Sequence, residues 1–410
     1  MNTDWTCGIS SSAVRQRTCR WLLILTAACG AMASWPCHAR EIYLNVQSGA
    51  DTNPGTAKAP LATAQRAVAL AQSGDVIHLG PEGAVIRQEI VLTNKDGLTI
   101  EGHGCTLTGA DPLPQDNWEP VGPNLARRRM PQPPMQRHLL IVAGKANRMG
   151  RSPTVRPPFP EPGQLQPGQF CWEDIPDAAW KDGKRPKDAK GKPVVSKEGW
   201  LYVCGPRAGM EWSVRVAGVR TSARGRDLTI RNLNCRHALN DGFNIHGDWR
   251  GLRCTNITGY ENFDEGFSAH EACECWIDDG RFWGNDNAVA DVNLAETFYR
   301  RCEFRDSVST EVLFHGGKHS LDDCQIVATG RNAFLASATT VGKDQTRVPI
   351  ECRLSRCEFR SADDPPRGFV LNDADLQMND CKLQKVQWDP TDSRVTIRQC
   401  TLDGKPLPSP

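Results

Sequence analysis

The stretches YRRCEF at residues 299–304 and LDDCQI at residues 321–326 share one pattern. Each has an apolar residue, two polar residues, a cysteine, one polar residue and a second apolar residue. The same or a closely related pattern occurs eight times, at Ile230-Leu233-Cys235, Cys254-Ile257-Gly259, Ile277-Gly280-Phe282, Tyr299-Cys302-Phe304, Leu321-Cys324-Ile326, Leu354-Cys357-Phe359, Met378-Cys381-Leu383 and Ile397-Cys400-Leu402. Successive copies start 19 to 33 residues apart. That spread is too variable for a helical repeat but suits coils whose turns absorb insertions.

The residues around these copies indicate short strands. Val, Ile and Phe fill the strand positions, Asn, Asp and Gly crowd the gaps, and no amphipathic helix of ordinary length follows residue 226. We therefore predict an all-β fold, a right-handed parallel β-helix in which strands of neighbouring coils lie ~4.8 Å apart. The repeated cysteines then form an inward stack in which Cys acts as a small hydrophobic residue.

The amino-terminal part supports this fold by resemblance. The strand-like Ile42–Asn45, the turn Asp51–Gly55, the helical Ala62–Gln72 and the strand-like Gly74–Leu79 and Gly97–Gly102 resemble the opening of pectin-lyase-like β-helix proteins, a carbohydrate-active superfamily. The resemblance covers roughly residues 41–110 and 226–402. It implies that the first strand and helix close the end of the β-helix and protect its exposed edge.

The sequence between these two regions breaks the pattern. Residues 111–225 are rich in proline and carry a charged run at 181–192, but they also hold six large aromatic residues, at Trp118, Phe170, Trp172, Trp180, Trp200 and Trp212. That aromatic content argues against a disordered linker. We predict a signal peptide at 1–39, an amino-terminal cap and first coil at 40–110, an inserted β-rich lobe at 111–225 and the main coils at 226–410.

The leader and the composition bear on location. Arg15, Arg17 and Arg20 precede an apolar run at 21–33 that is too short to span a bilayer, and small residues follow it. This layout predicts a cleaved secretory signal, hence a secreted or periplasmic protein with no transmembrane segment; a lipoprotein anchored at Cys29 is less favoured. The 49 Lys+Arg against 48 Asp+Glu give no overall field for nucleic acid. We expect a monomer.

Two further stretches suggest a functional strip. NDGFNIHG at 240–247 and DEGFSAHE at 264–271 each place an acid before Gly-Phe and a His three residues after the Phe. Because side chains alternate across a strand, an inward Phe243 implies an outward Asn244 and His246. Aligning later coils predicts one outward row, which reads His246, His270, Asp291, His315, Ser337, Asn372.

A second row is predicted at the turn that precedes this strand: Asp241, Glu265, Asp286, Thr310. Stacked like charges are unfavourable unless one is protonated or a cation lies among them. The candidate catalytic residues are therefore His246, His270, His315, Asp291, Glu265, Asp241 and Asp286. Glu265, Asp286 and Asp291 could bind Ca²⁺, and a less favoured alternative is Zn²⁺ held by the three His and Asp291. Asn244, Tyr260, Lys318 and Arg331 are candidate substrate-binding residues.

An extended groove on a β-helix suits a polysaccharide substrate, and the resemblance implies lyases, polygalacturonase-type hydrolases or uronan epimerases. Hydrolysis needs two carboxyls, ~5 Å apart for retention and ~6.5–9.5 Å for inversion. Elimination or C5-epimerisation instead needs a base such as His270, together with a cation or arginine for the uronate carboxylate. Our expectation is a secreted polysaccharide lyase or glycoside hydrolase. The alternatives are a uronan C5-epimerase and a non-catalytic glycan- or partner-binding protein.

Overall fold

The computed structural model describes residues 39–148, 159–176, 186, 187, 189, 191 and 194–408. Apart from Ala39, the predicted signal peptide lies outside the described residues. Within the described part of the chain, no helix is both long and apolar enough to cross a membrane.

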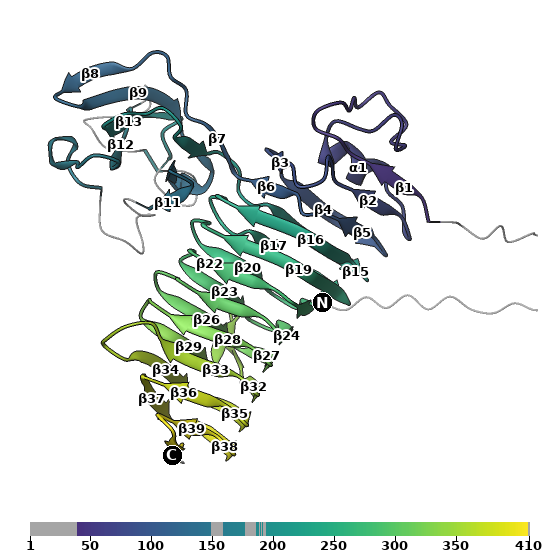
Figure 1. Cartoon of the computed structure of the whole chain (residues 1–410), viewed down its shortest axis with the longest axis vertical. Helices are drawn as coiled ribbons and strands as arrows, with labels where there is room; N and C mark the ends of the chain where they lie inside the picture. The colour runs from purple at the N-terminus through teal and green to yellow at the C-terminus, as the bar shows by residue number, and fades with distance from the viewer. Residues whose placement is uncertain are drawn as a thin grey trace, which may run out of the picture. The chain divides into compact units, whose positions relative to one another are not determined.

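The chain is a right-handed parallel β-helix, as the sequence predicts. Each of the central coils adds two strands to a 20-stranded sheet and one strand to a 10-stranded sheet, and Figure 1 shows these coils stacked from teal to yellow. The 10-stranded sheet holds β4 (Ile90–Asp96), β15 (Val219–Arg226), β17 (Phe243–Ile245), β18 (Asp248–Arg250), β20 (Glu265–Ala269), β23 (Asn287–Val292), β26 (Thr310–His315), β29 (Asn332–Ser337), β34 (Arg367–Asn372) and β37 (Val386–Thr391).

The 20-stranded sheet forms the other walls of the β-helix. Its members are β1 (Glu41–Tyr43), β2 (Val76–His78), β3 (Val85–Ile86), β5 (Thr99–Glu101), β6 (Thr106–Thr108), β16 (Thr229–Arg236), β19 (Leu252–Tyr260), β21 (Glu274–Asp278), β22 (Arg281–Trp283), β24 (Glu296–Arg300), β25 (Glu303–Arg305), β27 (Gly317–Asp322), β28 (Gln325–Ala328), β32 (Ile350–Ser355), β33 (Glu358–Ser361), β35 (Ala374–Asn379), β36 (Lys382–Gln384), β38 (Arg394–Arg398), β39 (Thr401–Leu402) and β40 (Lys405–Pro406). Helix α1 (Ala64–Leu70) begins after Thr63, whose side chain accepts a hydrogen bond from the Arg66 N–H.

The repeated cysteine pattern marks the bend between the two strands that each coil gives to the 20-stranded sheet. The polar residue just before the cysteine has a left-handed backbone, with φ of 54° at Arg301, 54° at Asp323, 52° at Arg356 and 55° at Asp380. This conformation turns the chain and directs the following cysteine into the core. The thirteen cysteines among the described residues are all buried and free.

The core lies inside the coils. On the 10-stranded sheet, the inward-facing Phe267 of β20 has an equivalent residue in the neighbouring coils. The residues paired in this way are Phe243, Phe267, Val289, Val312, Phe334 and Phe369, and none of their side chains is exposed. Fully burying one such side chain contributes about 1.5–3 kcal/mol. The column therefore fixes which side chains of the same strands must face outward.

A group of antiparallel strands interrupts the coils between β6 and β15. One four-stranded sheet consists of β7 (Ala110–Pro112), β10 (Leu140–Val142), β11 (Lys145–Asn147) and β14 (Glu211–Ser213). The other consists of β8 (Glu119–Gly122), β9 (Leu125–Pro131), β12 (Phe170–Asp174) and β13 (Glu198–Cys204). Short 3₁₀ helices occupy Pro134–Gln136 and Pro162–Gln164. We call this group the lobe; its apolar core includes Phe170, Trp172 and Trp212.

A small hairpin accounts for the longest interval of the repeat. Strands β30 (Thr339–Val341) and β31 (Thr346–Val348) pair only with each other, while β29 pairs directly with β34 and β27 with β32. The hairpin therefore projects from an otherwise regular coil.

Candidate functional site

The histidine row exists, but one of its predicted members is wrong. His246 and His270 lie in neighbouring coils with their rings stacked, 4.0 Å between centroids. In the next coil, Asp291 pairs with Ala269 rather than with His270, and Val292 pairs with His315. The outward row therefore reads His246, His270, Val292, His315, Ser337, Asn372.

The three histidines differ in their surroundings. His246 Nδ1 lies 3.1 Å from a carboxylate oxygen of Glu271. Burial, reinforced by the His246 ring, lowers the pKa of His270 to about 4, so its imidazole is neutral at physiological pH. His315 Nδ1 lies 2.6 Å from the hydroxyl of Ser337, and burial lowers its pKa as well. Within the row, His270 and His315 therefore favour the uncharged imidazole.

Asp291 was predicted to be a catalytic and Ca²⁺-binding residue, and the structure shows that this prediction is wrong. Its side chain is fully buried, with 0% exposure, and points into the core. Its oxygens accept hydrogen bonds from the Ala269 N–H at 2.9 Å and the Tyr299 hydroxyl at 2.8 Å, and one of them lies 2.7 Å from the Thr297 hydroxyl. Burial raises the pKa of Asp291 to about 7. An aspartate held in this way can reach neither substrate nor an outward metal ion, so the zinc alternative loses a ligand too.

The acid row shows the same one-residue error. The Glu265 N–H donates to Asp241 at 3.1 Å, and these two residues occupy equivalent positions in neighbouring coils, as predicted. Glu265 then pairs with Asn287, not Asp286. Asp286 instead follows Asp264, whose carbonyl accepts the Asp286 N–H at 2.7 Å. Asp241 and Glu265 therefore belong to one row, and Asp264 and Asp286 belong to the adjacent row.

Three carboxyl groups come together at the amino-terminal ends of β17 and β20. One oxygen from each of Asp241, Asp264 and Glu265 lies within 4.8 Å of the other two. We call these residues the acid cluster. Asp241 is 1% exposed, whereas Asp264 and Glu265 are partly accessible. A ligand would therefore contact Asp264 and Glu265, and Asp241 would act from behind them.

The hydrogen bonds indicate where the proton of the acid cluster lies. Asp241 accepts from the Ser268 hydroxyl at 2.6 Å, the Asn240 amide at 2.9 Å and the Glu265 N–H, whereas Glu265 accepts from Asn287 at 2.9 Å. The Asp241 and Glu265 carboxyls lie close enough to repel each other when both are ionised, which favours a proton on one of them. Because Asp241 receives more donors, the proton belongs on Glu265. Burial, with the charges of Asp264 and Asp241, raises the pKa of Glu265 well above its usual value. Burial also raises the pKa of Asp241.

Sequence reasoning missed Arg137, which the lobe brings to the acid cluster. Its guanidinium forms an ion pair with Asp264 at 2.6 Å, donates to the Leu239 carbonyl at 3.2 Å and lies 5.3 Å from the Phe263 ring. Nearby, Arg148 Nε donates to the Phe263 carbonyl at 3.2 Å. More than 100 residues separate Arg137 from its partners, and no local motif surrounds it, so the sequence carried no signal for this contact.

The predicted substrate-binding residues do not gather in one place. Asn244 lies beside Ser268 but is only 5% exposed. Tyr260 ends β19, ahead of the turn to the acid cluster, and its ring stacks on Trp283 at 4.6 Å. Lys318 lies in the 20-stranded sheet between Glu296 and Glu351, on a different wall. Arg331 is exposed and follows Ser309 in the row of Asp264 and Asp286.

The histidine row and the acid cluster are separate features. Glu265 and His270 are five positions apart on one extended strand, which corresponds to about 16 Å at ~3.3 Å per residue. The predicted strip that combines both is therefore two sites at opposite ends of the same strands.

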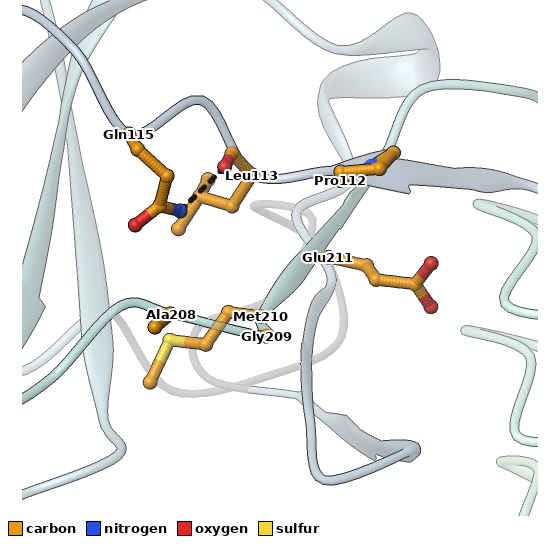
Figure 2. Close-up of a pocket in the computed structure, with 7 residues that line it drawn as sticks. All are labelled: Pro112, Leu113, Gln115, Ala208, Gly209, Met210 and Glu211. Atoms are coloured by element: carbon orange, nitrogen blue, oxygen red, sulfur yellow. Dashed lines mark hydrogen bonds between the residues drawn. The ribbon is translucent and has the colours of Figure 1, made fainter.

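The hollows outside the acid cluster include one beside the histidine row and one in the lobe. One, of about 440 Å³, is lined by Glu271, Ala272, Asn293, Leu294, Thr340, Val341 and Gly342, between the turns after the histidine row and the β30–β31 hairpin. The other, of about 380 Å³, belongs to the lobe and is shown in Figure 2. There Gln115 donates to the Leu113 carbonyl at 2.7 Å, and the carboxylate of Glu211 points away from Gln115 and pairs with Arg87.

The acid cluster supplies carboxylate oxygens of the kind that Ca²⁺ prefers, but only three residues contribute, against the six to eight oxygens that Ca²⁺ takes. Arg137 already brings a positive charge to Asp264. Of the residues predicted to bind Ca²⁺, only Glu265 belongs to this cluster.

Comparison with known proteins shows the fold. The complex of XylC with xylose matches with a TM-score of 0.51 at 10% identity, over 86% of this chain and 70% of that one. Pectate lyase Pel9A matches with a TM-score of 0.50 at 10% identity, over 91% of this chain and 82% of that one. No protein-family model and no curated protein sequence matches the chain. The chain thus shares the β-helix fold of these proteins, as the sequence resemblance predicts.

Proposed function

We propose that the protein is a glycoside hydrolase that cleaves a polysaccharide at the acid cluster. One observation carries this proposal: one carboxyl oxygen from each of Asp241, Asp264 and Glu265 lies within 4.8 Å of the other two. The pKa of Glu265, raised well above its usual value, agrees with it. A protonated carboxyl beside an ionised one is the acid and nucleophile pair that retaining glycoside hydrolysis needs. The fold that the protein shares with Pel9A is compatible with an extended glycan but does not select the reaction.

Each residue has a distinct role in this reaction. Glu265 donates its proton to the glycosidic oxygen as that bond breaks, and Asp264, oriented by Arg137, attacks the anomeric carbon. Water then hydrolyses the glycosyl ester while Glu265 takes back a proton. Asp241 does not touch the sugar; it is a positioning residue whose charge favours the protonated form of Glu265. The short carboxyl separation favours retention of anomeric configuration over inversion.

The test is turnover of purified protein on a panel of neutral and acidic polysaccharides, scored by new reducing ends. We expect Glu265→Gln and Asp264→Asn each to lower kcat by about 10³-fold or more, because each removes an acid or nucleophile. Glu303→Gln is the matched control, because Glu303 lies in the 20-stranded sheet and pairs with Arg305. If both variants keep the activity of the wild type, the acid cluster is not the catalytic site. An absence of new reducing ends on every glycan would exclude hydrolysis.

A second candidate reaction is elimination on a uronan, and His270 favours it. Its lowered pKa leaves a neutral imidazole that could remove the proton beside a uronate carboxylate. Unsaturated products that absorb in the near ultraviolet, lost in His270→Ala but not in Glu265→Gln, would select this lyase reaction. Epimerisation at C5 would use the same base without cleavage, and glycan binding without turnover would leave a non-catalytic protein.

We further propose that the protein is exported and acts as a monomer. We also propose Ca²⁺ as an alternative ligand of Asp241, Asp264 and Glu265, in place of the set predicted from the sequence. Running the same panel with and without added calcium, alongside calorimetry with calcium alone, tests that ligand. Heat on titration that is lost in Asp264→Asn would support binding at the acid cluster.

A further inference from the structure

A chain of hydrogen bonds crosses the core beneath the histidine row. Asp291, Thr297 and His319 form it, and these side chains are 0%, 0% and 3% exposed. The Thr297 hydroxyl lies 2.7 Å from Asp291 and 2.7 Å from His319 Nδ1. His319 Nε2 lies 2.7 Å from the Gly316 carbonyl. The proposed hydrolysis uses none of these groups.

The hydrogen-bond partners of Asp291, Thr297 and His319 determine how many dissociable protons Asp291 and His319 hold together. A carbonyl oxygen can only accept, so His319 Nε2 carries a proton. If His319 is neutral, its Nδ1 must accept, and the Thr297 hydroxyl donates its single proton to Nδ1. The 2.7 Å contact between Thr297 and Asp291 then requires a proton on Asp291. If His319 is instead charged, the direction of both bonds reverses and Asp291 is ionised. In both arrangements the pair holds one dissociable proton.

We infer that Asp291 and His319 share a single buried proton, that this proton resides on Asp291, and that the network positions the histidine row. Separated charges in an apolar core cost more free energy than a neutral pair, which places the proton on Asp291. His319 is then the neutral Nε2–H tautomer, and its ring stacks on Phe314 at 4.1 Å between centroids.

The ionisation behaviour of the two groups agrees with this assignment. Burial raises the pKa of Asp291 to about 7 and lowers the pKa of His319 to about 4. Among the described residues, the other titratable groups next to the pair are the Tyr299 hydroxyl from β24, which donates to Asp291, the Cys275 thiol from β21, and the Cys352 thiol from β32, which pairs with His319. All three stay neutral because burial raises the pKa of each above its usual value.

The network is tied to the histidine row at both ends. Asp291 accepts the Ala269 N–H at 2.9 Å, and His270 follows Ala269 in the chain. His319 holds the Gly316 carbonyl, and His315 precedes Gly316. If the shared proton is lost, the lone pairs of Thr297 and His319 Nδ1 face each other, and one of these contacts must break. Asp291 and His319 are thus positioning residues for His270 and His315.

The first test uses the wild-type protein and nitrogen NMR of its imidazoles. We expect His319 to be the Nε2–H tautomer at pH 6, with no titration between pH 5 and 6.5 and a change centred near pH 7 as the network loses its proton. A His319 ring protonated only on Nδ1 would overturn the inference, as would one that titrates like a free imidazole.

The second test measures how the free energy of unfolding changes with pH in two variants, and the two slopes should have opposite signs. Between pH 4 and 6.5 the unfolded pair holds one proton on His319, and the folded pair holds one on Asp291, so the pair contributes no slope. In Asp291→Asn, folding must release the proton of His319, and stability rises with pH across this window. In His319→Phe, the folded state retains a proton on Asp291 that the unfolded state has lost, and stability falls as pH rises across the same window.

Each slope approaches a tenfold change in the folding equilibrium constant per pH unit, because one proton is involved. Measuring both variants relative to wild type cancels the other titrating groups. The double variant should restore the wild-type slope. Identical slopes for all four proteins would overturn the inference. Thr297→Val, which keeps the side-chain shape, should shift the NMR signals of His270 and His315; unchanged signals would remove the positioning role while leaving the shared proton intact.

Discussion

Glu265 illustrates how a single position can acquire acid chemistry. Burial is the main reason that its pKa is raised, and the carboxylates of Asp264 and Asp241 add to it. An acid catalyst must be protonated, so activity should fall as pH rises through the pKa of Glu265. The sequence identified Glu265 and Asp241 as candidates from their spacing, but the burial that distinguishes their roles depends on packing that a spacing does not contain.

Asp241→Asn tests this view at the residue scale. The substitution removes one of the negative charges that favour protonated Glu265, so the pKa of Glu265 falls and the alkaline limb of kcat/KM shifts to lower pH. The shift should be about one pH unit, the effect of one neighbouring charge worth ~1.4 kcal/mol. A pH profile of kcat/KM measures it, with Glu303→Gln as control. A limb that stays in place would mean that Asp241 does not control Glu265.

Strand β23 shows why one element of the site was misplaced. The intervals from Glu265 to Asn287 and from His270 to Val292 are both 22 residues, whereas the sequence alignment used 21. A slip of one residue exchanges the two faces of a strand, and it moved Asp291 from the core to the surface. Val289, which aligns with Val312 in the core, was the available signal. The alternating Ala288 and Ala290 obscured it, because alanine fits either face.

The cysteine stack of the bends gives a prediction at the element scale. Cys302, Cys324, Cys357, Cys381 and Cys400 lie at equivalent bends, each 4% exposed or less. The native protein should therefore not react with a thiol reagent, whereas the unfolded chain from residue 39 to 408 should react at thirteen thiols. Cys324→Ala should cost about 1 kcal/mol of unfolding free energy and Cys324→Ser about 1–3 kcal/mol, because serine buries a stronger polar group. Denaturant unfolding measures both. Serine tolerated as well as alanine would argue against an apolar stack.

On the scale of the whole molecule, the solenoid could be predicted and the contacts of the lobe could not. The β-helix repeats its pattern eight times, so an error in one coil leaves the others in place. Arg137 reaches Asp264 from a segment without any repeat, and its position depends on how the antiparallel strands of the lobe pack against the turns around Phe263. Long-range contacts of this kind occur once, so no internal comparison within the sequence reveals them.

The β30–β31 hairpin offers a test of how independent the coils are of their insertions. Thr339 and Val348 are directly paired, so a two-residue Asn-Gly turn can replace residues 340–347. The neighbouring coils pair without the hairpin, and shortening a loop changes its closure free energy by only about 1 kcal/mol or less. The lost Arg347–Asp373 ion pair is exposed and contributes little. We expect a thermal transition close to that of the wild type, measured by circular dichroism. A matched excision of Ile350–Cys357 removes the core side chains Ile350, Cys352, Leu354 and Cys357 and should abolish the cooperative transition. Equal damage from both excisions would show that the hairpin, too, is required for the registry of the coils.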